Sequence, residues 1–199
     1  MKRRQVLTGL TATFALPQLA RAQGFVQQVS LAHPQLIRQQ CAEWCWAASA
    51  SMIFEMNGHP TDQKVIVSSV FGAPKCVPAG KSSVIGSVLS ASWKDDNGDD
   101  FQSTVTAAYD AANNINLISN AFILNELANN RPLLYANTHH AMAVVGIKYI
   151  ATPAGPNVQQ VDVLDPWPGS PAIHPLNLPE IVPSMLGGQM TFLAAVQIS

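Results

Sequence analysis

The sequence predicts an α+β fold in which helices come first and an antiparallel β-sheet comes last. Two observations carry this prediction. A long apolar segment near residue 50 has the length and composition of a buried helix, and the last third of the chain holds strand-like segments separated by connections that contain Pro, Gly or Asn. This segregation of helices and strands is typical of α+β proteins and differs from a repeating βαβ pattern.

Three helices are expected before the sheet. The first covers Trp44 to Asn57, a largely apolar segment without Pro or Gly that ends at Asn57-Gly58, a typical helix stop. A shorter helix fits Thr61 to Val70, and a third covers Asn120 to Asn130. The stretch from Cys76 to Gln102 is expected to be rich in loops.

The spacing of apolar residues changes from helix-like to strand-like after Pro132. The segments that follow are rich in Val, Ile, Leu and Tyr, which favour strands. The expected strands are Leu133 to Ala136, His140 to Ile150, Val158 to Leu164 and Met190 to Ile198.

The amino terminus resembles an export signal. Residues 2–4 are basic, Val6 to Ala20 is an apolar stretch too short and broken to span a membrane, and Ala20-Arg21-Ala22 is a small-x-small cleavage site. We therefore expect a signal peptide over residues 1–22 and one domain over residues 23–199, located in the periplasm or secreted. The adjacent arginines fit a twin-arginine signal as well as an ordinary one.

Composition excludes several function classes. Of the 199 residues 48% are hydrophobic and 12% charged, which suffices for a sizeable core, and the formal net charge is −1. No basic run follows residue 22, so neither nucleic acid nor an anionic membrane surface is an expected partner.

The three cysteines leave one pair and one remainder in an oxidising compartment. Cys41 and Cys45 could form half of a zinc site, but Cys76 has no neighbouring ligand at the required spacing. The acidic stretch from Lys94 to Asp100 lacks the calcium-loop pattern and is expected to be a solvated turn. No metal and no cofactor are expected.

Cys45 stands where the first helix is expected to begin. Unpaired peptide N–H groups and the helix dipole favour an anion there, which suits a thiolate nucleophile. The alternative is that Cys45 is a small buried residue on an apolar helix.

A histidine and a carboxylate are expected to meet at one end of the sheet. His139 and His140 start one strand, and Asp165 ends the next. If the two strands form a hairpin centred near Ala154, residue 140 lies opposite about residue 168, and a bulge brings Asp165 within reach. A surface histidine and an Asp-Pro turn are the alternative interpretations. Together, Cys45, the histidine and Asp165 match the general pattern of an activated thiol, in which a base next to the thiol is held by a third group.

The segment from Gln39 to Ser49 resembles the active-site segment of papain-like cysteine peptidases, in which a glutamine precedes the nucleophile by six positions and Cys-Trp-Ala opens the central helix. His140 to Gly146 resembles the His-Ala strand of that family, which favours His140 over His139. Asp165-Pro166-Trp167 is similar to its Asn-x-Trp segment, with Asp as in the peptidase domains of bacteriocin exporters.

The resemblance implies a papain-like fold whose central helix carries Cys45 as nucleophile. It further implies His140 as general base, Asp165 as the residue that orients it, and Gln39 as a donor to the oxyanion. Trp167 would shield the His–Asp hydrogen bond from water, or else belong to the core.

The resemblance also implies a disulfide between Cys41 and Cys76, although the family's cysteine lies three residues before the nucleophile and Cys41 lies four before. The expected function is an exported cysteine peptidase with a polypeptide substrate and a cognate inhibitor or immunity protein as a possible partner. A deamidase, amidase or transglutaminase-like enzyme, or a catalytically silent binding domain, are the alternatives.

Overall fold

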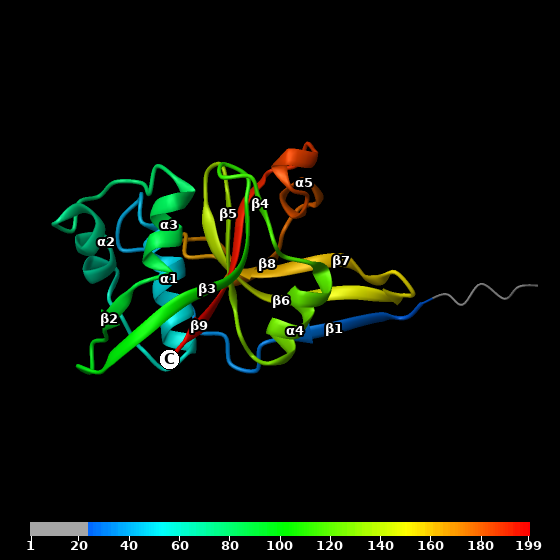
Figure 1. Ribbon diagram of the computed structural model, residues 1–199, viewed down its shortest axis with the longest axis horizontal. Helices are drawn as coiled ribbons and strands as arrows, with labels where there is room; N and C mark the ends of the chain where they lie inside the picture. The colour runs from blue at the N-terminus through cyan, green and yellow to red at the C-terminus, as the bar shows by residue number, and fades with distance from the viewer. Residues whose placement is uncertain (1–23) are drawn as a thin grey trace, which may run out of the picture.

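In the computed structural model, which describes residues 24–199, the first three helices of the chain pack beside a twisted antiparallel sheet (Figure 1). The helices are α1 (Cys45–Met56), α2 (Gln63–Phe71), α3 (Ser82–Val88), α4 (Asn120–Ala128) and α5 (Leu178–Ile181), with a 3₁₀ turn η1 (Ser184–Leu186). The strands are β1 (Val26–Ser30), β2 (Ser92–Lys94), β3 (Asp100–Asp110), β4 (Ile115–Asn116), β5 (Leu133–Asn137), β6 (Ala141–Thr152), β7 (Gly155–Leu164), β8 (Ile173–Pro175) and β9 (Met190–Ile198).

The sheet runs in the order β2-β3-β9-β5-β6-β7-β8, with β1 paired to β6 and β4 paired to β3. The pairings between these strands are antiparallel. The carboxy-terminal strand β9 therefore lies inside the sheet, between β3 and β5, and the α+β prediction is confirmed.

The main helix, α1, is almost wholly buried. Its residues Trp46 to Phe54 are inaccessible to solvent, and α1 packs on β5 and β6 on one side and on α2 and α3 on the other. Phe54 contacts the rings of Trp93 and Phe101, which brings β2 and β3 to the same core. Burial of so many apolar side chains fixes the position of the whole helix, including its first residue, Cys45.

The expectation of a loop-rich stretch from Cys76 to Gln102 is wrong in part, because α3, β2 and the first residues of β3 lie within it. These elements are short or rich in Ser, Thr and Ala, so they carry little apolar periodicity. Strands β1, β4 and β8 were also not expected, and each is a short segment at the margin of the sheet.

Within residues 24–199 no helix is long and apolar enough to cross a membrane. The expected signal peptide, residues 1–22, lies outside the described residues.

Candidate active site

Cys45 is the first residue of α1 and is half-buried. The preceding residue, Trp44, adopts a non-helical conformation with φ −100° and ψ 19°, and no side chain caps the helix. The first turn also carries no acidic residue. The peptide N–H groups at this helix end are thus available to an anion at or near the Cys45 sulfur.

A tight turn between β5 and β6 positions His140. The side-chain oxygen of Asn137 accepts hydrogen bonds from the peptide N–H groups of His139 (2.9 Å) and His140 (2.8 Å). The Asn137 N–H in turn donates to the His140 carbonyl at 2.9 Å. His140 is therefore fixed at the start of β6, next to the end of α1, while the His139 side chain is exposed.

His140 and Asp165 meet directly. His140 Nε2 lies 2.6 Å from Asp165 Oδ1, and Oδ1 also accepts the Trp167 N–H at 2.8 Å. The hairpin of β6 and β7 turns after Thr152, which pairs with Gly155, and its register shifts twice along the ladder. Since Nε2 of His140 is hydrogen-bonded to Asp165, Nδ1 is the ring nitrogen that remains available to form a hydrogen bond with the Cys45 thiol.

Hydrogen bonds and charge stabilise the ionised forms of this pair against the opposing effect of burial. Burial alone would lower the pKa of His140, but the hydrogen bond to Asp165 and the nearby Cys45 thiol outweigh it and raise that pKa to about 9. Burial acts to raise the pKa of Asp165, yet hydrogen bonds from His140 and the Trp167 N–H hold it below its ordinary value. The geometry thus favours an imidazolium beside a carboxylate.

Two further side chains, which no sequence pattern singled out, lie around Asp165. His174 on β8 places its Nε2 3.2 Å from Asp165 Oδ2. The Arg38 guanidinium donates to the backbone carbonyls of Asp165 (3.0 Å), Trp167 (2.6 Å) and Ser170 (2.9 Å). Arg38 therefore holds the chain around Asp165 in a fixed shape without binding its carboxylate.

Trp167 lies beside His140 with its ring edge-on, at 6.4 Å between centroids and an interplanar angle of 83°. Its side chain is 47% exposed, so it is not an ordinary core residue. It covers one side of the imidazole and leaves its other face toward the cleft.

Gln39 is buried just behind the nucleophile segment. Its Nε2 donates to the carbonyls of Cys41 (3.0 Å) and Ala42 (2.8 Å), whereas its Oε1 is buried without a partner. The opposite amide orientation would set Oε1 against two carbonyl oxygens, so the assignment is the favourable one. Without substrate, both amide hydrogens of Gln39 are thus engaged within the loop before Cys45.

Three links join the nucleophile segment to residues 75–77. Cys41 and Cys76 form a disulfide with 5.9 Å between their Cα atoms, the pairing that the resemblance implied. The indole N–H of Trp44 donates to the Lys75 carbonyl at 2.8 Å, and that of Trp46 to the Val77 carbonyl at 3.4 Å. Cys45 and the segment that continues into α3 are therefore held together.

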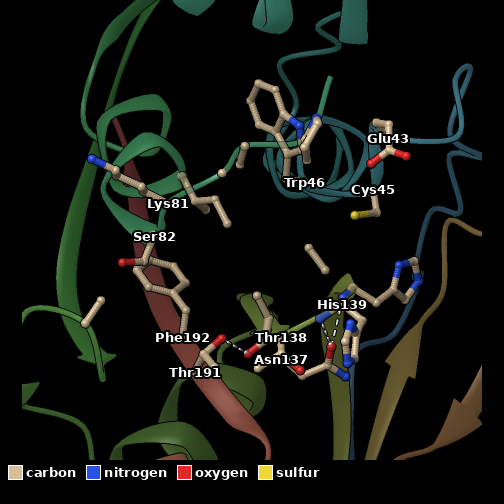
Figure 2. Close-up of a pocket in the computed structure, with 18 of the residues that line it drawn as sticks. Glu43, Cys45, Trp46, Lys81, Ser82, Asn137, Thr138, His139, Thr191 and Phe192 are labelled. Atoms are coloured by element: carbon tan, nitrogen blue, oxygen red, sulfur yellow. Dashed lines mark hydrogen bonds between the residues drawn. The ribbon is translucent and has the colours of Figure 1, made fainter. Parts of the chain in front are cut away.

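A cleft of about 600 Å³ lies in front of Cys45 and His140. Figure 2 shows Cys45 at the end of α1 across from His139, with Lys81, Ser82 and Phe192 toward the opposite side of the cleft. A cleft of this volume is of the size that holds a small molecule or a short peptide segment.

One buried carboxylate, Asp110, holds the far wall of the cleft. It accepts hydrogen bonds from the Ser82 hydroxyl (2.9 Å), the Asn113 side chain (2.7 Å) and the peptide N–H groups of Ala112 and Asn113. It thereby ties the start of α3 to the turn after β3, and both line the cleft.

A model of the Peptidase_C39 like family matches residues 25–175. The chain belongs to this family. The match covers α1, the His140 turn, Asp165 and His174, and the papain-like α+β fold is that of a family of cysteine peptidases. No curated protein matches the chain. Among residues 24–199 of this family member, no group of three or more His, Cys, Asp or Glu side chains could hold a metal ion.

Proposed function

We propose that this C39-like family member hydrolyses peptide bonds with Cys45 as nucleophile, His140 as general base and acid, and Asp165 as the group that orients His140. The observation that carries the proposal is the His140–Asp165 hydrogen bond of 2.6 Å at the cleft that also contains Cys45. A nucleophile, a base and an orienting group at one cleft are the requirements of thiol catalysis.

In this mechanism the Cys45 thiolate attacks the carbonyl carbon of the scissile bond and forms a tetrahedral intermediate. The Cys45 peptide N–H donates to the oxyanion, and Gln39 is the second expected donor once its amide releases one backbone carbonyl. The His140 imidazolium gives its Nδ1 proton to the leaving amine. Collapse of the intermediate expels the amine and leaves a thioester on Cys45. His140 then takes a proton from water, whose oxygen attacks the thioester carbonyl, and the Cys45 thiolate leaves beside the protonated His140.

Cys45→Ala tests the proposal. The variant should lose hydrolysis of casein, measured as new α-amino groups, while its free energy of unfolding changes by no more than about 1 to 2 kcal/mol. Ser49→Ala, one turn further along α1, is the matched control and should keep full activity. If Cys45→Ala retains the wild-type rate, the thiol mechanism is wrong.

Deamidase, amidase and transglutaminase-like activities use the same three groups. They are separated from a peptidase by their products, because they release ammonia from glutamine-containing substrates and create no new chain ends. A catalytically silent binding domain would give neither product.

We also propose export to the periplasm or beyond. The Cys41–Cys76 disulfide supports it, because such bonds persist in oxidising compartments. Processing after Ala22, detected by mass spectrometry of the expressed protein, tests this point, and an uncleaved cytoplasmic chain would contradict it.

A further inference from the structure

A second histidine contacts the carboxylate of the proposed triad. Asp165 is 5% exposed, and each of its two oxygens faces an imidazole nitrogen. Oδ1 lies 2.6 Å from His140 Nε2, and Oδ2 lies 3.2 Å from His174 Nε2. The mechanism above uses the His140 contact but gives no role to the His174 contact.

The pairing of β7 with β8 places His174 next to the Asp165 carboxylate. Strand β8 pairs with the end of β7 so that His174 stands opposite Val163, and the Asp165 N–H donates to the Ala172 carbonyl at 3.2 Å. The other ring nitrogen of His174, Nδ1, lies 3.1 Å from the Pro175 carbonyl. The ring is thus contacted at both nitrogens and its side chain is only 28% exposed, so it is not a free surface histidine.

A carboxylate needs contacts on both oxygens to be fixed in rotation, because the terminal torsion of Asp has a broad, two-fold preference. His140 and the Trp167 N–H both bind Oδ1. A donor on Oδ2 prevents the carboxylate from turning about that point, and His174 lies at hydrogen-bond distance from Oδ2.

We propose that His174 is a positioning residue, which holds the Asp165 carboxylate in the orientation that stabilises the His140 imidazolium. The neighbouring charged groups are Cys45 beyond His140 and Arg38, whose guanidinium binds the carbonyl of Asp165 and not its carboxylate. On β7, Asp162 is occupied by the Gln160 amide. The Ser170 side chain also approaches the Asp165 carboxylate as a hydrogen-bond donor, but among the described residues His174 is the group that lies at hydrogen-bond distance from Oδ2.

Three substitutions of the full chain test this inference. His174→Phe keeps a ring on β8 but removes the donor, His174→Gln restores an N–H donor at nearly the same place, and Ile173→Ala perturbs the adjacent, half-exposed position of β8 without touching the hydrogen bond. Two experiments are done on each variant. Kinetics on casein gives kcat and KM, and NMR of the His140 ring C–H signals gives the pKa of His140.

We expect His174→Phe to lower kcat roughly tenfold to a hundredfold with little change in KM, since a misplaced catalytic group costs about that much. The pKa of His140 should fall from about 9 toward 6.5. His174→Gln should recover most of both quantities, and Ile173→Ala should resemble the wild type.

An unchanged or raised His140 pKa in His174→Phe would overturn the inference. So would equal losses in the Phe and Gln variants, or the same loss in Ile173→Ala, because both would point to packing of β8 alone. The inference rests on the proposed function for its kcat readout. The NMR titration needs no turnover, so a protein that cleaves nothing would refute the proposed function while the pKa shift still decides the role of His174.

Discussion

His140 Nε2 and Asp165 Oδ1 lie 2.6 Å apart although 25 positions separate the two residues in the chain. The pairing of β6 with β7 brings them together, and the turn at Asn137 sets the direction of the imidazole. Because the hydrogen bond uses Nε2, the remaining nitrogen, Nδ1, is available at the cleft.

Substitutions at Asp165 should separate orientation from charge. Asp165→Asn retains an oxygen that accepts the His140 N–H, so this variant should keep much of the activity. Asp165→Ala removes the acceptor and should be at least roughly tenfold slower than the Asn variant. The measurement is kcat/KM on casein, and equal rates for the two variants would show that Asp165 does not orient His140.

His140 should also make stability depend on pH. The pKa of His140 rises from 6.5 to about 9 on folding. The stabilisation that the protonated imidazole adds to the free energy of unfolding is therefore fully present below about pH 6.5 and is lost as pH rises through about 9. The difference in unfolding free energy between wild type and His140→Gln should therefore be larger at pH 6 than at pH 10. Urea titrations at both values measure it.

His139→Gln is the matched control for that experiment, because the neighbouring side chain is exposed. It should show no such difference between the two pH values, and it should keep its activity. If His139→Gln is inactive while His140→Gln is active, the wrong histidine was chosen.

Gln39 has a role that kinetics can define. If its amide serves the oxyanion, Gln39→Ala should lower kcat about a hundredfold while KM changes little, because the interaction forms only in the transition state. Gln39→Glu should be similarly slow, since a carboxylate repels an oxyanion. A Gln39→Ala variant with normal kcat and lower thermal stability would instead assign Gln39 to support of the Cys41–Ala42 backbone.

The far wall of the cleft should affect binding more than chemistry. Asp110→Ala removes the acceptor for Ser82 and Asn113, so KM should rise severalfold with a smaller change in kcat, and stability should fall by about 2 kcal/mol. Asp99→Ala is a control with an exposed acidic residue. Equal KM values for Asp110→Ala and wild type would show that this wall does not contact substrate.

The convergence of His140 and Asp165 could be predicted because it depends on strand order and hairpin register. Both can be inferred from the apolar strand segments and from the turn between them. The central position of the turn, near Ala154, was enough to bring the two residues within a bulge of each other, and the structure contains such register shifts. The buried helix that carries Cys45 was equally visible from its apolar composition.

Arg38 and His174 could not be predicted in the same way. Arg38 binds carbonyl oxygens, which every residue has, so its partners leave no mark in the sequence. His174 lies on a strand of three residues among Pro, Gly and Ser, too short to show alternation. A search for histidines within ten residues of Asp165 would have found His174. Closeness in sequence alone, however, does not show that the two side chains are in contact, because that depends on the pairing of β8.

The disulfide beside the nucleophile sets conflicting demands on the redox potential of the surroundings. In the proposed mechanism Cys45 acts only as a reduced thiol, and oxidants convert an accessible thiol to sulfenic acid, which reductants reverse. The same reductants attack the Cys41–Cys76 bond, which anchors the loop leading into Cys45. The proposed activity should therefore pass through a maximum as reductant is added, which would confine it to a bounded range of redox potential.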